Sequence, residues 1–458
     1  MAEVLNRVIE KAIRGSAPAQ INVPRDYWCQ VIDIDLPPIV RLERQGGGAD
    51  AISKAADLLS KAKFPVILSG AGVVIGGAIE ETKKLAEKLD APVCSGYQHN
   101  DSFPGSHPLA VGPLGYNGSK AAMELISKAD VVLALGTRLN PFSTLPGYGI
   151  DYWPKKASII QVDMNPDRIG LTKKVTVGIS GDAKLVATQI LEKLSSNAGD
   201  TDRQKRKDLI HQTKSAWLQK LSSLDHEDDD EGTVWNKEAR ERDADRMSPR
   251  QAWRAIQSGM PEDVIISSDI GNNCAIGNAY PTFEKPRKYL APGLFGPCGY
   301  GFPSILGAKI GCPDTPVIGF AGDGAFGISM NEMSSCAREE WPAITMVIFR
   351  NYQWGAEKRN TTLWFDNNFI GTELDPKLSY AKVADACGLK GVTVRTMEET
   401  TEAIKKSCED QKKGITTFIE VILNQELGEP FRRDAMKKPV RVAGINKKDM
   451  KPQKSLNG

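Results

Sequence analysis

The feature that most constrains the fold is an alternation of short apolar segments with amphipathic segments. In a first series, apolar stretches such as residues 65–72 (PVILSGAG) and 129–139 (ADVVLALGTRL) follow segments of helical periodicity such as 52–62 (ISKAADLLSKA). Short apolar runs between amphipathic helices are typical of βα units, whose parallel strands are buried on both faces. We therefore expect a central α/β domain over residues 46–195.

A second series of the same kind covers residues 248–425. Its apolar strands include residues 317–321 (VIGFA) and 344–349 (ITMVIF), and a helix is expected over 328–340. The fold class is therefore α/β, with two doubly wound parallel-sheet domains. Between them, the charge-rich residues 196–247 predict a solvated connector that is partly helical around 209–221. Residues 426–458 predict an irregular tail.

Residues 1–45 differ from both series. Residues 1–15 predict an amphipathic helix, 18–26 (PAQINVPRD) a short strand, and 31–50, with a Pro pair and a Gly run, a linker. The apolar face of the helix holds Val4, Leu5, Val8, Ile9 and Ile13. Two explanations stay open: the end of a domain whose beginning is missing, or an extension packed on the next domain.

Composition excludes several classes of function. The net charge is +2, with acidic and basic residues mixed along the chain, which argues against nucleic-acid or membrane partners recognised by bulk charge. The eight cysteines form no CxxC pair, so we expect reduced thiols in a cytoplasm. No apolar run approaches the roughly 20 residues that cross a bilayer.

Two oxygen donors are expected at the carboxyl ends of successive strands. Asp323 follows strand 317–321 within GDGA, and Asn351 follows strand 344–349. Ligands of open α/β sheets bind at that edge, and a carboxylate with an amide oxygen suits Mg²⁺ better than zinc. Gly322 and Gly324 allow a ligand to approach the backbone, and the next helix favours an anion. The alternative is a structural Asp in a tight turn.

The segment from Leu306 to Ala325 resembles the signature of thiamine-diphosphate enzymes. The matching positions are Leu306, Gly307, Pro313, Ile318, Phe320, Gly322, Asp323, Gly324 and Ala325. The resemblance implies thiamine diphosphate held through Mg²⁺, with Asp323, Asn351 and the backbone carbonyl of Gln353 as metal ligands. The family has an Asn-Asn pair where this chain has Arg350-Asn351, so the first Asn is replaced.

Further cofactor contacts follow from the same resemblance. SDIGNNCAIG resembles the loop that meets the diphosphate, which implies Gly271, Asn272 and Asn273. GPCGYGFP resembles the loop beneath the thiazolium ring and places Cys298 there, although simple packing is an equal alternative. The Asn351 side of the cofactor would be covered by Gly355 and Ala356, and the signature adds Ala325.

The first series resembles the central domain of acetolactate-synthase-like enzymes. This resemblance rests on LSGAGVVIGGA, HPLAVGPLG, LALGTRL and VDMNPDRIG. Gly70 and Gly72 hint at dinucleotide binding, but the full GxGxxG spacing is not met. We therefore expect no flavin. His99 and His107 fall in loops of this domain and are expected to be structural.

Nearly the whole chain resembles the sulfoacetaldehyde acetyltransferase family. The segments AGDGAFGISMNEM, MVIFRNYQWGAEKRNTTLWFDNNFIGTEL and NQELGEPFRRDAMKKPV carry this resemblance. It implies conversion of sulfoacetaldehyde and phosphate into acetyl phosphate and sulfite. Both substrates are anions, so Arg350, Lys358 and Arg359 are candidates to bind them at the mouth of the site; the alternative is ordinary surface charge or a dimer contact.

Residues 1–45 resemble the end of the family's first domain, so we expect them to be a remnant of a pyrimidine-binding domain and its linker. The glutamate that activates the cofactor would lie in the missing part, so we expect this chain alone to be inactive. The resemblance also implies a homodimer or homotetramer, with no nucleic-acid or membrane partner. Two other functions stay open: a pyruvate-using synthase of the acetolactate type, and a non-catalytic cofactor-binding subunit.

Overall fold

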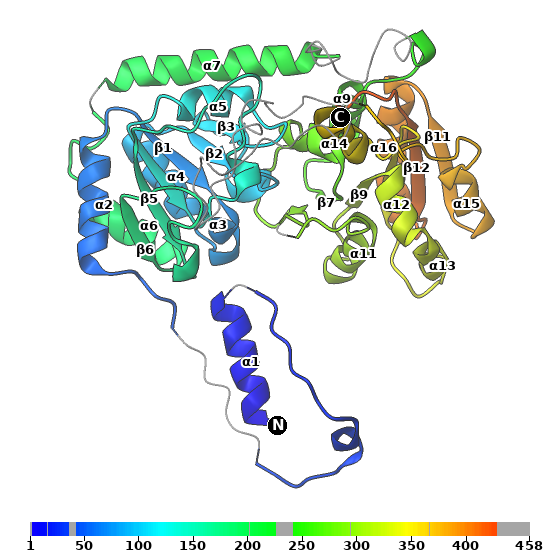
Figure 1. The fold of residues 1–458 in the computed structure, drawn as a ribbon, viewed down its shortest axis with the longest axis horizontal. Coiled ribbons are helices and arrows are strands. Elements are labelled where there is room, and N and C mark those ends of the chain that lie inside the picture. Colours follow the sequence, from blue (N-terminus) through cyan, green and yellow to red (C-terminus); the bar gives the residue numbers. More distant parts are fainter. Residues whose placement is uncertain are drawn as a thin grey trace, which may run out of the picture.

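The computed structural model describes residues 2–15, 17–35, 43–200, 202–225, 241–293, 295–365 and 367–427, without the side chains of 362–364. The described residues leave out part of the expected linker, the acidic middle of the connector and nearly all of the expected tail. Figure 1 shows two α/β units side by side, with the N-terminal helix below the first of them.

The first unit contains a six-stranded sheet in the order β3-β2-β1-β4-β5-β6. All of its neighbouring strands are parallel. The strands are β1 Pro65–Ser69, β2 Val93–Ser95, β3 Ala110–Pro113, β4 Val131–Leu135, β5 Ser158–Asp163 and β6 Val177–Ser180. Because the strand order reverses between β1 and β4, the loops diverge there and leave a crevice at the carboxyl ends.

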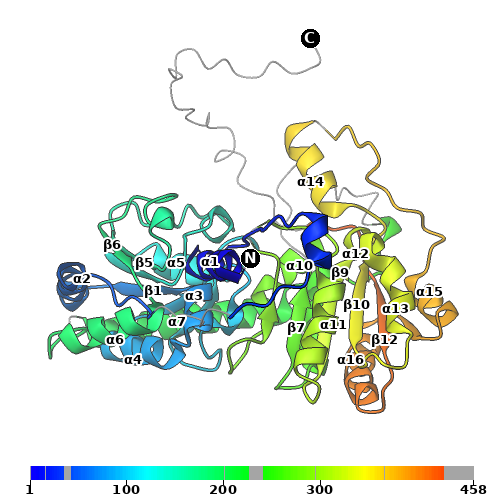
Figure 2. The ribbon, with the colours of Figure 1, turned by 90° about the horizontal axis from the view of Figure 1, so that it is seen from below.

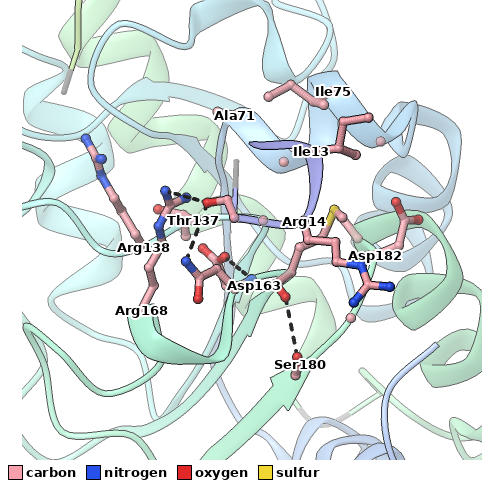
Figure 3. Close-up of a pocket in the computed structure, with 18 of the residues that line it drawn as sticks. Ile13, Arg14, Ala71, Ile75, Thr137, Arg138, Asp163, Arg168, Ser180 and Asp182 are labelled. Atoms are coloured by element: carbon pink, nitrogen blue, oxygen red, sulfur yellow. Dashed lines mark hydrogen bonds between the residues drawn. The ribbon is translucent and has the colours of Figure 1, made fainter. Parts of the chain in front are cut away.

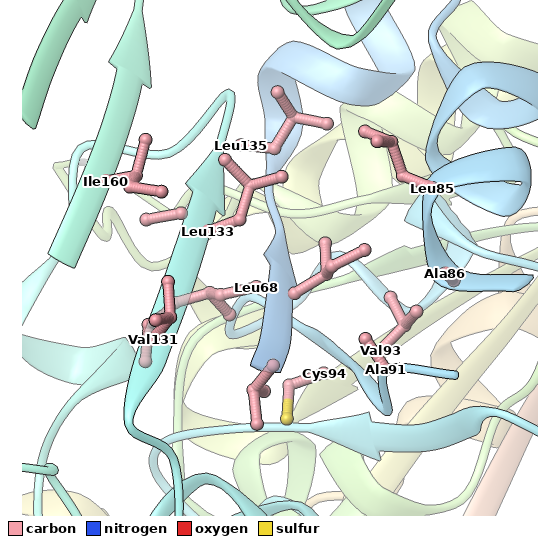
Figure 4. Packing of buried hydrophobic residues seen from close by; sticks show 14 of the residues in the cluster. Leu68, Leu85, Ala86, Ala91, Val93, Cys94, Val131, Leu133, Leu135 and Ile160 are labelled. Carbon is pink, nitrogen blue, oxygen red and sulfur yellow. The ribbon is translucent and has the colours of Figure 1, made fainter. Parts of the chain in front are cut away.

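Helices cover both faces of this sheet. They are α2 Ala49–Lys61, α3 Ala71–Gly76, α4 Ile79–Leu89, α5 Lys120–Ile126 and α6 Ala183–Lys193, with short 3₁₀ turns η2 Asn100–Ser102, η3 Pro141–Ser143 and η4 Pro166–Arg168. Leu68, Leu133 and Ile160 come from three adjacent strands, and none of them is exposed (Figure 4). Burying each of these side chains contributes roughly 2 kcal/mol.

The second unit repeats this architecture, with sheet order β11-β12-β10-β9-β7-β8 and parallel neighbours throughout. Its strands are β7 Ile265–Ser268, β8 Tyr289–Leu290, β9 Val317–Gly322, β10 Thr345–Arg350, β11 Lys390–Val394 and β12 Thr417–Ile422. Its helices are α9 Pro249–Gly259, α10 Asn272–Ile276, α11 Gly301–Gly311, α12 Asp323–Ser329, α13 Met333–Cys336, α14 Gly355–Trp364, α15 Tyr380–Ala386 and α16 Met397–Gln411, with η5 Gly277–Ala279 and η6 Met330–Glu332. The predicted α/β class is confirmed.

The helix expected over 328–340 begins earlier and is interrupted. α12 starts at Asp323, because Gly322 is still extended at φ −70° and ψ 157° and the chain turns directly from strand to helix. Ser329, at φ −112° and ψ 10°, leaves α-helical geometry, and the chain continues through η6 to α13. The helix N-terminus therefore falls on Asp323 itself.

The N-terminal helix is confirmed as α1 Ala2–Gly15, but the strand expected over 18–26 is wrong. No described strand pairs with this segment, and Pro18 and Pro24 lack the N–H groups that a sheet needs. A turn, η1 Arg25–Cys29, follows instead. Figure 2 shows α1 in front of the first unit, and the Arg168 guanidinium donates to the Gly15 carbonyl at 3.1 Å.

The connector contains a long helix, α7 Arg203–Ser223, that packs on the first unit and is not fully solvated as expected. Ile210, Trp217 and Leu221 are buried on its inner face. Arg206 is also buried and donates to the carbonyls of neighbouring loops, including that of Leu89 at 2.9 Å. None of the described helices is both long enough and apolar enough to cross a membrane.

Buried polar contacts join the two units. Asn100 Nδ2 donates to the carbonyls of Asn278 and Pro281 at 2.7 and 2.8 Å. The carboxylate of Asp101 accepts the backbone N–H of Lys288 at 3.0 Å. These contacts hold loops of the first sheet against the edge of the second.

Candidate active site

Two neighbouring strands of the second sheet deliver Asp323 and Asn351 to one edge. β9 and β10 are adjacent and parallel, with Gly322 paired to Phe349. Asp323 directly follows β9, and Asn351 directly follows β10. The backbone N–H of Tyr352 donates to Asp323 Oδ2 at 2.7 Å. The structure therefore brings the two strand ends into contact, as their positions in the sequence predict.

The Asp323 carboxylate is buried and held by hydrogen bonds. Its side chain is 1% exposed. Oδ1 accepts the N–H of Gly324 at 3.0 Å, and Oδ2 also accepts Arg350 Nη1 at 3.1 Å. Burial raises the pKa of Asp323 to about 6, although Arg350 and the backbone donors act to lower it. A fixed carboxylate of this kind is a hard oxygen donor.

Arg350 lies in the interior and not at a mouth open to substrate, which corrects the expectation from the sequence. Its side chain is 1% exposed, and its Nε lies 3.6 Å from Glu420 Oε1. The guanidinium also donates to the carbonyl of Leu378 at 3.0 Å. Glu420 was not predicted, because it lies on β12, which neighbours β10 only in the folded sheet. Arg350 is thus a buried partner of carboxylates.

Asn351 and Gln353 are each 2% exposed. The backbone carbonyl of Asn351 accepts a hydrogen bond from Gln425 Nε2 at 3.2 Å, and Gln353 Nε2 donates to the backbone carbonyl of Gln425 at 3.1 Å. Gln353 Oε1 is buried and has no hydrogen-bond partner among the described residues. A buried polar atom of this kind is costly unless a ligand or water meets it.

Glycines border open space on two sides of this edge. A Cβ atom added to Gly322 or Gly271 would meet nothing within 4 Å, and Gly271 has a φ of 135° that favours glycine. Gly324 differs, because a Cβ there would lie 2.8 Å from the Trp354 ring. Gly324 thus makes room for Trp354, whereas Gly322 and Gly271 border space that a ligand can fill.

The loop after β7 adds polar groups from α10. Asn272 is already engaged: its Oδ1 accepts the Tyr116 hydroxyl at 3.2 Å and its Nδ2 donates to the Leu427 carbonyl at 2.8 Å. Asn273 is 4% exposed, and its Oδ1 has no partner among the described residues. Gly355 lies close by, because a Cβ there would be 3.4 Å from Asn272 Nδ2.

The donor set fits a hard divalent cation that carries a diphosphate. One buried carboxylate, one amide oxygen and a backbone carbonyl are all oxygen ligands, as Mg²⁺ prefers. In the part of the chain that the structure describes, no group of three His, Cys, Asp or Glu residues could hold a metal. The orphaned oxygens of Gln353 and Asn273 and the open space at Gly322 and Gly271 are consistent with a ligand here.

Comparison with known proteins agrees with this geometry. A model of the thiamine pyrophosphate enzyme central domain matches residues 52–190. A model of the C-terminal TPP binding domain of these enzymes matches residues 269–421, which include both strand ends. A probable sulfoacetaldehyde acetyltransferase of Rhizobium meliloti is 78% identical over 99% of this chain and 77% of its own length.

The chain belongs to the thiamine pyrophosphate enzyme family.

A further relative supports this assignment, and a solved structure shows the same fold. A sulfoacetaldehyde acetyltransferase of Roseovarius nubinhibens is 72% identical over 99% of this chain and 75% of its own length. The crystal structure of benzoylformate decarboxylase from Polynucleobacter necessarius has the same fold, with a TM-score of 0.71 at 20% identity. That comparison covers 93% of this chain and 74% of the decarboxylase.

In this thiamine pyrophosphate enzyme, Cys298 lies on a loop fixed by Asp269. The N–H groups of Gly299 and Gly301 donate to the two Asp269 oxygens at 3.1 and 2.7 Å. Cys298 is partly buried, and burial raises the pKa of its thiol, as do the charges of Asp269 and Glu357. Glu357 belongs to the first turn of α14, so its effect on this thiol indicates that the Cys298 loop lies near the start of α14. Gly355 and the partly buried Ala356 lie at the same place.

Lys358 and Arg359 are buried on α14 and are not surface cations. Lys358 Nζ pairs with Glu373 at 2.5 Å. The Arg359 guanidinium lies 4.5 Å from the centre of the Tyr116 ring, and burial lowers the pKa of Arg359 to about 10. Tyr116 comes from the first unit and also meets Asn272, so both units contribute to this side of the site. Its role was not predicted, because nothing near Tyr116 in the sequence indicates the contact.

A cavity of about 1780 Å³ lies at the carboxyl edge of the first sheet and was not predicted either. Figure 3 shows Ile13 and Arg14 of α1 on one side of it and Arg138, Asp163 and Arg168 on the other.

Of the two glycines that hinted at dinucleotide binding, Gly72 borders this cavity. A Cβ on Gly72 would lie 2.6 Å from the Gly136 Cα, and one on Gly70 would lie 2.5 Å from the Gly136 carbonyl. Close packing of two loops therefore explains both glycines without a ligand.

The two histidines have different surroundings. His107 Nε2 lies 3.3 Å from Glu87, and its Nδ1 accepts the N–H of Leu109, which is consistent with a structural role. His99 borders the cavity, and burial together with the charge of Arg138 lowers its pKa to about 4. His99 is therefore neutral in the folded protein at neutral pH.

Proposed function

We propose that the protein transfers an acetyl group with thiamine diphosphate, converting sulfoacetaldehyde and phosphate into acetyl phosphate and sulfite. The observation that carries this function is the identity of 78% and 72%, over 99% of the chain, to relatives named as sulfoacetaldehyde acetyltransferases. The Asp323 and Asn351 strand ends support it, because they suit a metal-bound diphosphate.

The proposed reaction is balanced without an external oxidant. The carbon–sulfur bond breaks and sulfite leaves, while the aldehyde carbon rises to the oxidation level of an acyl group. The neighbouring carbon is reduced to a methyl group, and a phosphate oxygen forms the new bond to the acyl carbon. The bound cofactor supplies the carbanion chemistry of such a transfer, and the protein supplies position and electrostatics.

We assign the metal contacts to Asp323, Asn351 and the Gln353 backbone carbonyl, with Mg²⁺ as the ion. Buried oxygens at fixed positions reduce the reorganisation that metal binding requires. Cofactor contacts are proposed for Gly271, Asn272, Asn273, Cys298, Gly322, Gly324, Ala325, Gly355 and Ala356. Of the two asparagines, Asn273 is the better candidate for a direct contact, since both polar ends of Asn272 already have partners.

For the anionic substrates, Lys358 and Arg359 remain the candidates, and Arg350 does not. Arg359 is buried beside Tyr116, and a cation with little water around it attracts an anion more strongly than a surface cation does. Arg350 is enclosed between Asp323 and Glu420 and does not reach a substrate.

We further propose a homodimer or homotetramer in the cytoplasm, acting on small molecules without a nucleic-acid or membrane partner. The family resemblance supports shared sites between chains. All eight cysteines are free thiols in the structure, which agrees with a reducing compartment.

The test uses the protein expressed from its complete coding sequence, with Mg²⁺ and thiamine diphosphate. Sulfoacetaldehyde and phosphate should yield acetyl phosphate and sulfite in equal amounts, and omission of phosphate should abolish acetyl phosphate. Pyruvate alone should give no acetolactate. Acetolactate formation without sulfite release would show instead that the enzyme is a pyruvate-using synthase.

Asp323→Asn keeps the shape of the side chain but removes its charge. It should lower acetyl phosphate formation at least a hundredfold, because the metal loses its one anionic protein ligand. Asp182→Asn is the matched control: Asp182 is also buried, at 2% exposure, but it caps α6 in the first unit by accepting the backbone N–H of Lys184. Equal losses in both variants would argue against Asp323 as a metal ligand.

A further inference from the structure

Arg350 lies directly behind the Asp323 carboxylate, and the proposed function gives it no role. We propose that Arg350 is a positioning residue that holds Asp323 Oδ2 and leaves Oδ1 as the atom that meets the metal. This inference rests on the proposed function, because it requires a metal at Asp323.

The hydrogen bonds of Asp323 distinguish its two oxygens. A carboxylate oxygen offers two lone pairs. Oδ2 accepts two donors, the Tyr352 N–H at 2.7 Å and Arg350 Nη1 at 3.1 Å. Among the residues that the structure describes, Oδ1 accepts one, the Gly324 N–H at 3.0 Å. Oδ2 is therefore saturated, and Oδ1 keeps one lone pair for a cation.

Arg350 is held so firmly that it acts as a fixed support. Its Nη2 donates to the carbonyls of Asp375 and Leu378 at 2.5 and 3.0 Å. The guanidinium carbon lies 4.3 Å from the centre of the Tyr352 ring and 5.3 Å from that of Tyr380. Carbonyls at one end and rings beside it fix both the position and the plane of the guanidinium, so Asp323 cannot rotate without losing its partner.

Glu420 completes the arrangement on the far side of Arg350. Its carboxylate accepts the hydroxyls of Ser379 at 2.7 Å and Thr393 at 3.4 Å. It also accepts the N–H of Tyr380 at 3.3 Å, and it lies 3.6 Å from Arg350 Nε. Asp323, Arg350 and Glu420 thus form one buried chain of alternating charge across three strands or strand ends.

Positioning and simple charge predict opposite results, which makes the role testable. Replacing Arg350 by a neutral residue removes a cation from beside the metal, so charge alone predicts tighter metal binding. If Arg350 positions Asp323, the same change weakens binding, because Oδ1 is no longer oriented. Replacing Glu420 by glutamine removes a negative charge, so charge alone predicts weaker metal binding. If Arg350 positions Asp323, metal binding should change little, because Arg350 stays in place.

The experiment measures the Mg²⁺ dissociation constant in the presence of thiamine diphosphate, by calorimetry and by Mn²⁺ electron paramagnetic resonance, together with the melting temperature. Arg350→Met should raise the dissociation constant at least tenfold. Arg350→Lys and Glu420→Gln should stay within about threefold of the unaltered protein, although all three variants lose buried contacts and melt earlier. If Arg350 served stability alone, the metal dissociation constants of the three variants would rise in proportion to the fall in their melting temperatures.

Arg206→Met is the matched control. Arg206 is a buried arginine of the other unit that donates to backbone carbonyls, so its loss should lower the melting temperature and leave the metal constant unchanged. Metal binding as tight or tighter in Arg350→Met would overturn the inference, as would a tenfold loss in Arg350→Lys. Failure of the unaltered protein to bind cofactor with metal would overturn the proposed function, and this inference with it.

A crystal structure with Mn²⁺ and thiamine diphosphate gives a direct check. The metal should contact Asp323 Oδ1, while Oδ2 stays on Arg350 and the Tyr352 N–H. A metal bound to Oδ2, with Arg350 displaced, would overturn the assignment even if the binding constants followed expectation.

Discussion

Asp323, Arg350 and Glu420 are charged side chains that are each at most 2% exposed. An unpaired charge in the interior costs several kcal/mol, so such groups persist only with partners. Arg350 pairs with both carboxylates, at 3.1 and 3.6 Å. The two acids and one base leave one net negative charge facing the strand-end edge, where a divalent cation would gain from it.

His99 gives a prediction about pH at the same scale. Its folded pKa of about 4 lies below the ordinary value of 6.5, because burial and Arg138 disfavour its charged form. The unfolded chain therefore binds more protons between these values, and the free energy of unfolding falls as the pH drops from 6.5 toward 4. We expect this residue to account for about 2 kcal/mol of that fall, since the ring is only half-buried.

Urea unfolding at several pH values checks this. His99→Gln cannot titrate, so its stability should fall less than that of the unaltered protein over the same range. His211 is exposed on α7, so His211→Gln serves as a matched histidine replacement away from the cavity. Identical curves for all three proteins would show that His99 is not the group responsible.

Residues of the candidate site could be predicted from the sequence where they directly follow an apolar run that forms a strand. Asp323 and Asn351 each follow an apolar run, so their shared edge follows from the sequence. The partners Glu420 and Tyr116 could not be predicted, because they reach the site from β12 and from the other unit. Those contacts depend on strand order and on docking between units, which local patterns do not contain.

At the scale of elements, the ends of β1 and β4 approach so closely that only glycine fits. Gly72 on α3 meets Gly136 after β4, where an added Cβ would lie 2.6 Å from a Cα atom. The opposing atoms belong to backbone and cannot move aside cheaply. This approach shapes the crevice of the first sheet.

Substitution of two glycines should therefore have opposite effects. Gly72→Ala should lower the free energy of unfolding by roughly 2–3 kcal/mol, because the loops must separate. Gly307 lies in α11, where a Cβ meets nothing within 4 Å. Gly307→Ala should raise the stability by about 0.5–1 kcal/mol through helix propensity. Urea unfolding measures both, and a Gly72→Ala protein of unchanged stability would contradict the packing argument.

The elements were predictable where burial alone defines them. The apolar runs 317–321 and 344–349 correspond to β9 Val317–Gly322 and β10 Thr345–Arg350, because central parallel strands are apolar on both faces. The strand expected over 18–26 was wrong, since a strand also needs a partner, which its own residues do not reveal. The broken helix after Asp323 depends on the single backbone conformation of Ser329.

At the scale of the whole molecule, two sheets of the same architecture meet through loops (Figure 1). The joining contacts are polar: those of Asn100 and Asp101 are buried, whereas that of Ser106 with Glu284 is exposed. The contact between Tyr116 of the first unit and Arg359 of the second belongs to the same junction and lies beside the candidate site. Docking of the two units should therefore influence the site as well as stability.

Asn100→Ala tests that junction. The side chain donates two hydrogen bonds, to the carbonyls of Asn278 and Pro281, and its loss leaves both buried carbonyls short of a donor. We expect the free energy of docking between the two units to fall by about 2–3 kcal/mol, because both of these hydrogen bonds run to the second unit. Calorimetry should then show the single unfolding transition broaden or divide in two, as the units begin to melt separately. Asn368→Ala, at an exposed position of the second unit, should leave the transition unchanged. A single sharp transition at a lower temperature for Asn100→Ala would mean that the two units are coupled mainly by contacts other than this one.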